Sequence, residues 1–194
     1  HRFNELSYWT DLAQTLEKGL FDGLFIADIT GVYDVYQNGI ELTLKESIQL
    51  PSHDPTTLVS AMAAVTQNLG FGITVNLSYE SPSQFARRFA SLDHLTQGRI
   101  GWNIVTGYLD SAERLIGQKG LKDHDLRYEQ AEEFLELCYK FWEGSWENDA
   151  VLKDKKQRIF TDPSKVHQIQ HQGQFYQSQG VFQVFPSVQR TPVL

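Results

Sequence analysis

The period of hydrophobic positions changes along the chain, which predicts an alternation of helices and strands. Residues 6–18 carry apolar side chains at helical spacing. The next apolar run, 23–27, is short and continuous, which predicts a strand buried on both faces, and a polar loop covers 30–53. Asp54 as N-cap and Pro55 as first helical residue then begin a second helix. Its core-facing side chains would be Leu58, Met62, Val65 and Leu69.

The same cycle repeats further along the chain. Residues 71–77 (FGITVNL) and 100–105 (IGWNIV) predict two more strands. Between them, the pattern Ser-Pro-Ser-Gln at 81–84 predicts a capping box at the start of a helix. A weaker helix is predicted at about 109–116 and a long one at about 125–142. The buried stripe of the long helix would be Tyr128, Ala131, Leu135, Cys138 and Trp142.

Apolar strands that alternate with helices predict an α/β fold with a parallel sheet covered by helices. The alternatives are an open doubly wound sheet and part of a (β/α)8 TIM barrel. No Gly-x-Gly-x-x-Gly follows the first strand, which favours the barrel. The pattern supplies three strands and, at 191–194, the opening of a fourth, so we expect a partial barrel excerpted from a longer chain. One partial barrel domain would then cover 1–194, with a Gln-rich excursion at about 144–186 that includes a hairpin at 174–176 and 181–185.

Composition removes several classes of function. The chain has 17 basic and 24 acidic residues, a net charge of −7, which argues against nucleic acid as a partner. No apolar run approaches the roughly 18 residues of a membrane span, so a membrane is not expected as a partner either. The single cysteine, Cys138, excludes an internal disulfide framework and suits a cytoplasmic location. Metal-binding and nucleophile motifs are absent from the predicted helices and turns, so we predict no metal site and expect a bound cofactor to carry the chemistry.

Polar residues at the carboxyl ends of strands are the first candidates for a site in a parallel barrel. A loop cap or a satisfied backbone contact is the competing interpretation for each of them. Asp28 is the sharpest candidate, because a carboxylate after four apolar residues is costly without a partner. The strand-end candidates are Asp28, Thr74, Asn76, Asn103 and Thr106.

His124 and Tyr128 form a second candidate pair at the start of the long helix. Their spacing of four places both side chains on one side of the helix, near its free N–H groups. Such an arrangement suits an anion or a phosphate. The competing interpretation is that His124 caps the helix and Tyr128 belongs to the core.

Three longer stretches are together very specific: 21–28 (FDGLFIAD), 101–106 (GWNIVT) and 124–134 (HDLRYEQAEEF). They resemble the luciferase-like flavin monooxygenases of the nitrilotriacetate/dibenzothiophene-sulfone monooxygenase type. The segments 142–146 (WEGSW), 162–166 (DPSKV) and 189–194 (QRTPVL) look like the same family in its fungal form. The resemblance covers nearly the whole chain, in order.

This resemblance implies a barrel that uses reduced FMN as a co-substrate, supplied by a separate NAD(P)H:flavin reductase. Through a C4a-peroxyflavin, O2 would oxygenate a small organic substrate, as in xenobiotic degradation. Carried over position by position, the family's flavin contacts fall on Asp28, Thr74, His124 and Tyr128. No catalytic residue is implied, and the full-length protein would be a homo-oligomer.

Two departures from the family pattern bear on pocket shape and substrate more than on flavin chemistry. Gly107 stands where many members have Ser, and 115–117 reads Leu-Ile-Gly where many have Asn-Phe-Gly. Two alternatives stay open at this point. One is a luciferase-like relative that uses a deazaflavin or another flavin-type cofactor, and the other is an inactive partial copy that acts only as an interaction module.

Overall fold

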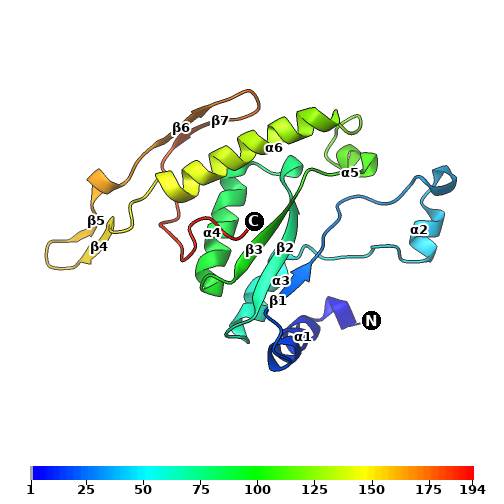
Figure 1. Ribbon diagram of the computed structural model, residues 1–194, viewed down its shortest axis with the longest axis horizontal. Coiled ribbons are helices and arrows are strands. Elements are labelled where there is room, and N and C mark those ends of the chain that lie inside the picture. Colours follow the sequence, from blue (N-terminus) through cyan, green and yellow to red (C-terminus); the bar gives the residue numbers. More distant parts are fainter. Residues whose placement is uncertain (1) are drawn as a thin grey trace.

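The computed structural model describes residues 2–194. Three parallel strands, β1 (Gly23–Ile26), β2 (Gly70–Asn76) and β3 (Ile100–Val105), form one sheet in the order β1-β2-β3 (Figure 1). Sequence neighbours are therefore sheet neighbours, as in a barrel, whereas a doubly wound sheet reverses its order. Val193 bridges in parallel to Gly101 of β3, so the predicted fourth strand begins there.

Helices cover one face of this sheet. Each packs on the next across that face: α1 (Leu6–Lys18) on α3 (Thr56–Ala64), α3 on α4 (Pro82–Thr96), and α4 on α6 (His124–Tyr139). The short helix α5 (Asp110–Leu115) precedes α6, and a π-helical turn, Lys140–Gly144, follows it. Among residues 2–194, no helix is both long and apolar enough to cross a bilayer.

The core lies between the sheet and these helices. Trp102 of β3 packs against Phe85 of α4, with tilted rings whose centroids are 4.1 Å apart, and its indole N–H donates to the Val75 carbonyl at 2.9 Å. The other face of the sheet is open at β1, where Phe25 is 60% exposed. The prediction that this strand is buried on both faces is therefore wrong for residues 2–194, because helices lie against only one of its faces.

The boundaries and caps of α3 and α4 differ in detail from the sequence prediction. Asp54 does cap its helix, since its carboxylate accepts the Thr56 N–H at 2.8 Å, but α3 begins one residue later than expected. The same helix ends at Ala64, so Val65 points outward and is 37% exposed. Helix α4 begins at Pro82 as expected, but the side chain of Ser81 makes no capping hydrogen bond, so the capping box does not form.

Two further corrections concern the long loop and the long helix. The expected loop at 30–53 contains the short helices η2 (Tyr36–Asn38) and α2 (Glu41–Lys45). On α6, Tyr128 is 52% exposed and does not join the core, because the buried part of the helix begins only at Gln130. The remaining short helices are η1 (Arg2–Asn4), η3 (Leu77–Tyr79) and η5 (Pro163–Lys165).

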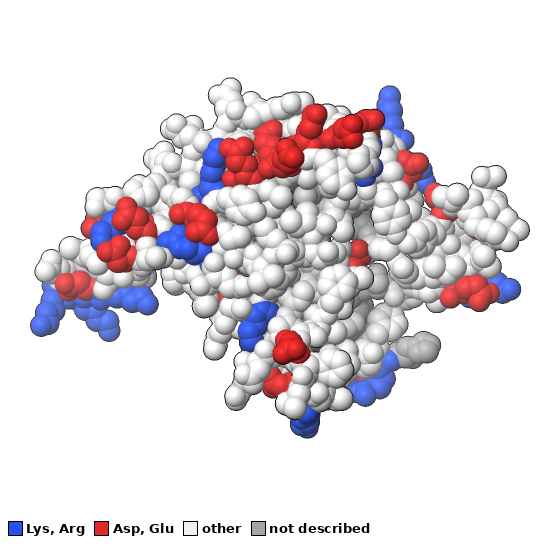
Figure 2. All heavy atoms as spheres, viewed as in Figure 1, with Lys and Arg blue, Asp and Glu red and all other residues white. Residues whose placement is uncertain are grey.

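Residues 144–186 leave the sheet as two antiparallel hairpins (Figure 1), β4 (Val151–Asp154) with β5 (Ile159–Thr161) and β6 (Ile169–Gln172) with β7 (Gln177–Gly180). The predicted hairpin position is wrong: residues 174–176 form the turn between β6 and β7. The reason is a long-range contact, because Glu133 of α6 accepts the N–H groups of Phe175 and Tyr176 at 2.9 and 2.7 Å. Acidic side chains gather along α6 and basic ones at the tip of the β4–β5 hairpin (Figure 2).

Glu17 of α1 holds the turn that leads into β2. One of its carboxylate oxygens accepts the backbone N–H groups of Gln67, Asn68 and Leu69 at 2.8, 2.6 and 3.0 Å. Hydrogen bonding from Asn68, with the two neighbouring N–H groups, lowers the pKa of Glu17 from its ordinary value of 4.5. The stabilisation is therefore present above the unfolded-state pKa and is lost as the pH falls through the lower folded-state pKa.

We predict that Glu17→Gln lowers the melting temperature of the full-length protein at pH 7, and that the gap to wild type narrows as the pH falls below 4.5. Thermal melts monitored by circular dichroism across this pH range measure it. Glu129→Gln is the control, because Glu129 is an exposed carboxylate of α6. Equal melting temperatures at pH 7, or a gap independent of pH, would contradict the prediction.

Candidate functional site

The carboxyl ends of β1, β2 and β3 surround a cavity of about 270 Å³. Two of the expected flavin contacts, Asp28 and Thr74, line it. The strand-end candidates Asn76 and Asn103 line it as well, whereas Thr106 does not. The remaining lining residues are mainly apolar or aromatic: Phe25, Ala27, Ile29, Tyr79, Val105, Tyr108 and Leu109, with Thr30 and Gly107.

Thr74 is held in place by the ladder between β2 and β3. The register pairs Thr74 with Asn103, and the Asn103 amide donates to the Thr74 hydroxyl at 3.0 Å. Thr74 is 4% exposed, so neighbouring residues enclose its side chain and restrict its rotamer. Because the hydroxyl oxygen accepts this bond, its own proton is free to be donated to a ligand in the cavity.

Asp28 follows β1 and lies between the cavity and an adjoining groove of about 590 Å³ formed with residues 47–52. Partial burial raises the pKa of Asp28, and the nearby charge of Asp54 raises it further, against a hydrogen bond from the Ile29 N–H that lowers it. The carboxyl group thus takes up a proton at a higher pH than a solvated aspartate does. It can accept a hydrogen bond when ionised and donate one when protonated.

Two tyrosines of the site carry no signal in the sequence. Burial, then the charge and hydrogen bonding of Glu113, raise the pKa of Tyr79 to about 12. Burial and a hydrogen bond with Tyr33 raise the pKa of Tyr108 to about 12. Each tyrosine follows the end of its strand by three residues, which is the only feature that could have marked them.

His124 and Tyr128 lie together but outside the lining of the cavity. Their rings are 4.7 Å apart between centroids, and both side chains are exposed. The helix cap is Asp123, whose carboxylate accepts the Asp125 N–H at 2.9 Å, and His124 Nδ1 contacts Asp125 Oδ1 at 2.9 Å. Neither part of the competing interpretation therefore holds, since His124 is not the cap and Tyr128 is not in the core.

One contact joins this helix start to the cavity. Arg127, between His124 and Tyr128, donates to the backbone carbonyl of Gly107, which lines the cavity. The structure thus brings Asp28 and Thr74 into one cavity and His124 and Tyr128 onto each other. It connects the two pairs through Arg127.

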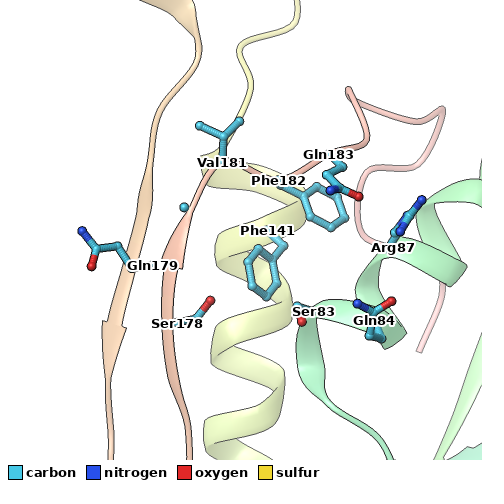
Figure 3. Close-up of a pocket in the computed structure, with 10 residues that line it drawn as sticks. Ser83, Gln84, Arg87, Phe141, Ser178, Gln179, Val181, Phe182 and Gln183 are labelled. Atoms are coloured by element: carbon cyan, nitrogen blue, oxygen red, sulfur yellow. The ribbon is translucent and has the colours of Figure 1, made fainter.

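A second hollow of about 270 Å³ lies away from the strand ends (Figure 3). It is formed between α4, with Arg87 as its charged residue, and β7 with the segment that follows it. At its base the rings of Phe141 and Phe182 stack at 5.2 Å. None of the candidate residues lines this hollow, so we assign the site to the cavity at the strand ends.

Residues 2–194 match the family model described as luciferase-like monooxygenase. The chain is 52% identical over 194 residues to the long-chain alkane monooxygenase of Geobacillus thermodenitrificans, covering 100% of this chain and 44% of that protein. It is 53% identical over 193 residues to the dimethyl-sulfide monooxygenase of Hyphomicrobium sulfonivorans, covering 100% of this chain and 40% of that protein. The chain therefore spans less than half the length of these curated relatives.

Solved structures agree with the sequence comparison. The crystal structure of a long-chain alkane monooxygenase matches with a TM-score of 0.96 at 52% identity, covering 99% of this chain and 44% of that one. A riboflavin lyase, crystallised with modified FMN and the substrate riboflavin, matches with a TM-score of 0.92 at 43% identity, covering 99% and 43%. The resemblance in the sequence and the partial barrel are thus confirmed, and the chain belongs to the family of luciferase-like monooxygenases.

Proposed function

We propose that the full-length protein is an FMN-dependent, two-component monooxygenase that uses reduced FMN and O2 to oxygenate a small organic substrate. A separate NAD(P)H:flavin reductase supplies the reduced flavin. The observation that carries the proposal is the strand-end cavity, which holds Asp28 and Thr74 in a chain of the luciferase-like monooxygenase family. A relative named nitrilotriacetate monooxygenase component A, 34% identical, supports the two-component arrangement.

The chemistry of the cavity suits a flavin ring. An isoalloxazine is flat and apolar on its faces, with hydrogen-bonding groups along its edge. Phe25, Val105 and Leu109 supply apolar walls, while Thr74 and Asp28 supply a proton donor and a carboxyl group. When bound, reduced FMN supplies the electrons with which O2 is activated.

The residues of the chain then bind and orient the flavin. Thr74 donates its hydroxyl proton, because Asn103 already occupies the hydroxyl oxygen. Asp28, whose pKa is raised by burial, holds or accepts a proton at the ring edge. The apolar walls exclude water, which strengthens both hydrogen bonds.

The phosphate end of FMN is assigned to the start of α6. The exposed rings of His124 and Tyr128 lie tilted against each other there, and Arg127 adds a cation within the same turn. The carboxylates of Asp123 and Asp125 oppose an anion at this point, and Asp123 already occupies one helix N–H. Phosphate binding therefore depends on the imidazole, the phenol and the guanidinium more than on the helix terminus.

The first prediction concerns the ring end. Asp28→Ala and Thr74→Ala each remove one hydrogen bond, worth about 0.5–1.5 kcal/mol, so each weakens FMN binding by about two- to twelve-fold. Fluorescence titration of FMN with the full-length protein measures the change. Ser83→Ala, in the second hollow, is the control for loss of a hydroxyl and leaves the affinity unchanged. Wild-type affinity in both cavity variants would sink the assignment of the ring end.

The second prediction concerns the phosphate end. Hydrogen bonds to a charged group are worth about 1.5–3 kcal/mol, so His124→Ala and Tyr128→Phe each weaken FMN binding by roughly ten- to a hundred-fold. Riboflavin, which lacks the phosphate, keeps its affinity. Tyr139→Phe, a second exposed tyrosine of α6, is the control. Equal losses for FMN and riboflavin, or no loss for either, argue against phosphate recognition by this pair.

A further inference from the structure

Gly107 occupies a position in the cavity wall where a side chain has no room. Its φ is +79°, and a Cβ built there meets the Asn76 amide nitrogen at 2.8 Å and the Tyr79 hydroxyl at 3.0 Å. Two polar side chains thus approach the backbone of residue 107 closely because glycine stands there. The departure from serine at this position therefore creates space inside the site, in addition to removing a hydroxyl.

The hydrogen bonds around Asn76 and Tyr79 have a fixed direction. The side-chain oxygen of Asn76 accepts the Ser78 N–H at 2.9 Å, so its amide nitrogen is turned toward Tyr79 and Gly107. The amide nitrogen can only donate, and hydrogen bonding of Asn76 lowers the pKa of Tyr79, so in this pair the phenol oxygen is the acceptor. On the other side is the carboxylate of Glu113, which is 3% exposed and whose charge and hydrogen bonding raise the pKa of the phenol, so the phenol proton is directed toward Glu113.

This arrangement leaves a donor and an acceptor side by side in the cavity wall. The Asn76 amide carries N–H donors that its bond to Ser78 does not use, and the Tyr79 oxygen carries lone pairs that can accept. Together they complement a ligand edge on which a carbonyl oxygen lies next to an N–H group. The phenol stays neutral at any ordinary pH, since burial and Glu113 keep its pKa near 12, so the pattern does not change with pH.

We infer that Asn76 and Tyr79 recognise the edge of the bound ring at which a carbonyl adjoins an N–H. Glu113 is the positioning residue for Tyr79, and the absence of a side chain at Gly107 leaves room for Asn76 and Tyr79. The inference rests on the proposed function, because the pyrimidine ring of FMN carries such an edge at its N3 position. It adds Asn76 and Tyr79 to Asp28 and Thr74 as residues that contact the ring. It places Asn76 and Tyr79 at the N3 position, where an alkylated analogue differs from FMN.

The test compares FMN with N3-methyl-FMN, in which the N–H is replaced by a methyl group, by fluorescence titration of the full-length protein. Wild type binds FMN several-fold more tightly than the methylated analogue. Tyr79→Phe weakens FMN binding by about two- to ten-fold and brings the two ligands to nearly equal affinity. The ring of Tyr79 remains in this variant, so the fold is retained, which a thermal melt verifies.

Glycine variants provide a matched pair. Gly107→Ala forces Asn76 and Tyr79 apart and weakens FMN binding at least as much as Tyr79→Phe. Gly117→Ala is the control, because Gly117 has nearly the same φ, +82°, but nothing within 4 Å of its Cβ position. Both variants carry the same backbone strain, and only Gly107→Ala changes FMN affinity.

Glu113→Gln tests the positioning role. With the negative charge removed, the pKa of Tyr79 falls below its value of about 12. The titration is followed by tyrosinate absorbance. Subtracting the absorbance of the double variant Glu113→Gln/Tyr79→Phe from that of Glu113→Gln isolates the signal of Tyr79. A merely structural role for Glu113 would leave the titration of Tyr79 in place.

The outcomes separate the two levels of the proposal. If wild type binds no FMN, the proposed function and this inference both fail. If wild type binds FMN, while Tyr79→Phe keeps the preference over the methylated analogue and Gly107→Ala binds like Gly117→Ala, this inference alone is overturned.

Discussion

The register between β2 and β3 is the constraint on which the site depends. Trp102 pairs with Ile73 in this ladder, and its side chain is fixed in the core by the bond to the Val75 carbonyl and by packing against Phe85. Side chains alternate along a strand, so the next pair, Thr74 with Asn103, must face the opposite side. A slip of β2 by one residue would turn Thr74 into the core, and a slip of β3 would expose Trp102. The packing of one face therefore places the hydrogen-bonding groups of the other.

The same alternation explains how much of the site could be predicted from the sequence. The sequence predicts that Asp28 and Thr74 lie in one cavity because strand ends in a parallel sheet meet at one edge, a rule that needs only the order of the elements. Tyr79 was missed because its position depends on the backbone at Gly107 and on a buried carboxylate from α5. The exposure of Tyr128 was missed for a related reason, since helical spacing does not show where a helix extends past the sheet it covers. Long-range contacts, rather than local pattern, decided both positions.

The chain matches one part of relatives that are named for different substrates. Relatives named for an alkane and for dimethyl sulfide are 52% and 53% identical to the chain, so its similarity does not follow the substrate. A segment shared across different substrates is expected to carry what those enzymes have in common. In this chain the strand-end cavity, which we propose to be the flavin site, is the candidate for that shared part.

The most direct test of this account is a crystal structure of the full-length protein with bound FMN. The account predicts that the isoalloxazine ring lies at the carboxyl ends of β1, β2 and β3, within hydrogen-bonding distance of Thr74, with the phosphate beside His124 and Tyr128. A flavin bound in the hollow between α4 and β7 (Figure 3), or a ring elsewhere that leaves Thr74 bonded only to Asn103, would contradict it.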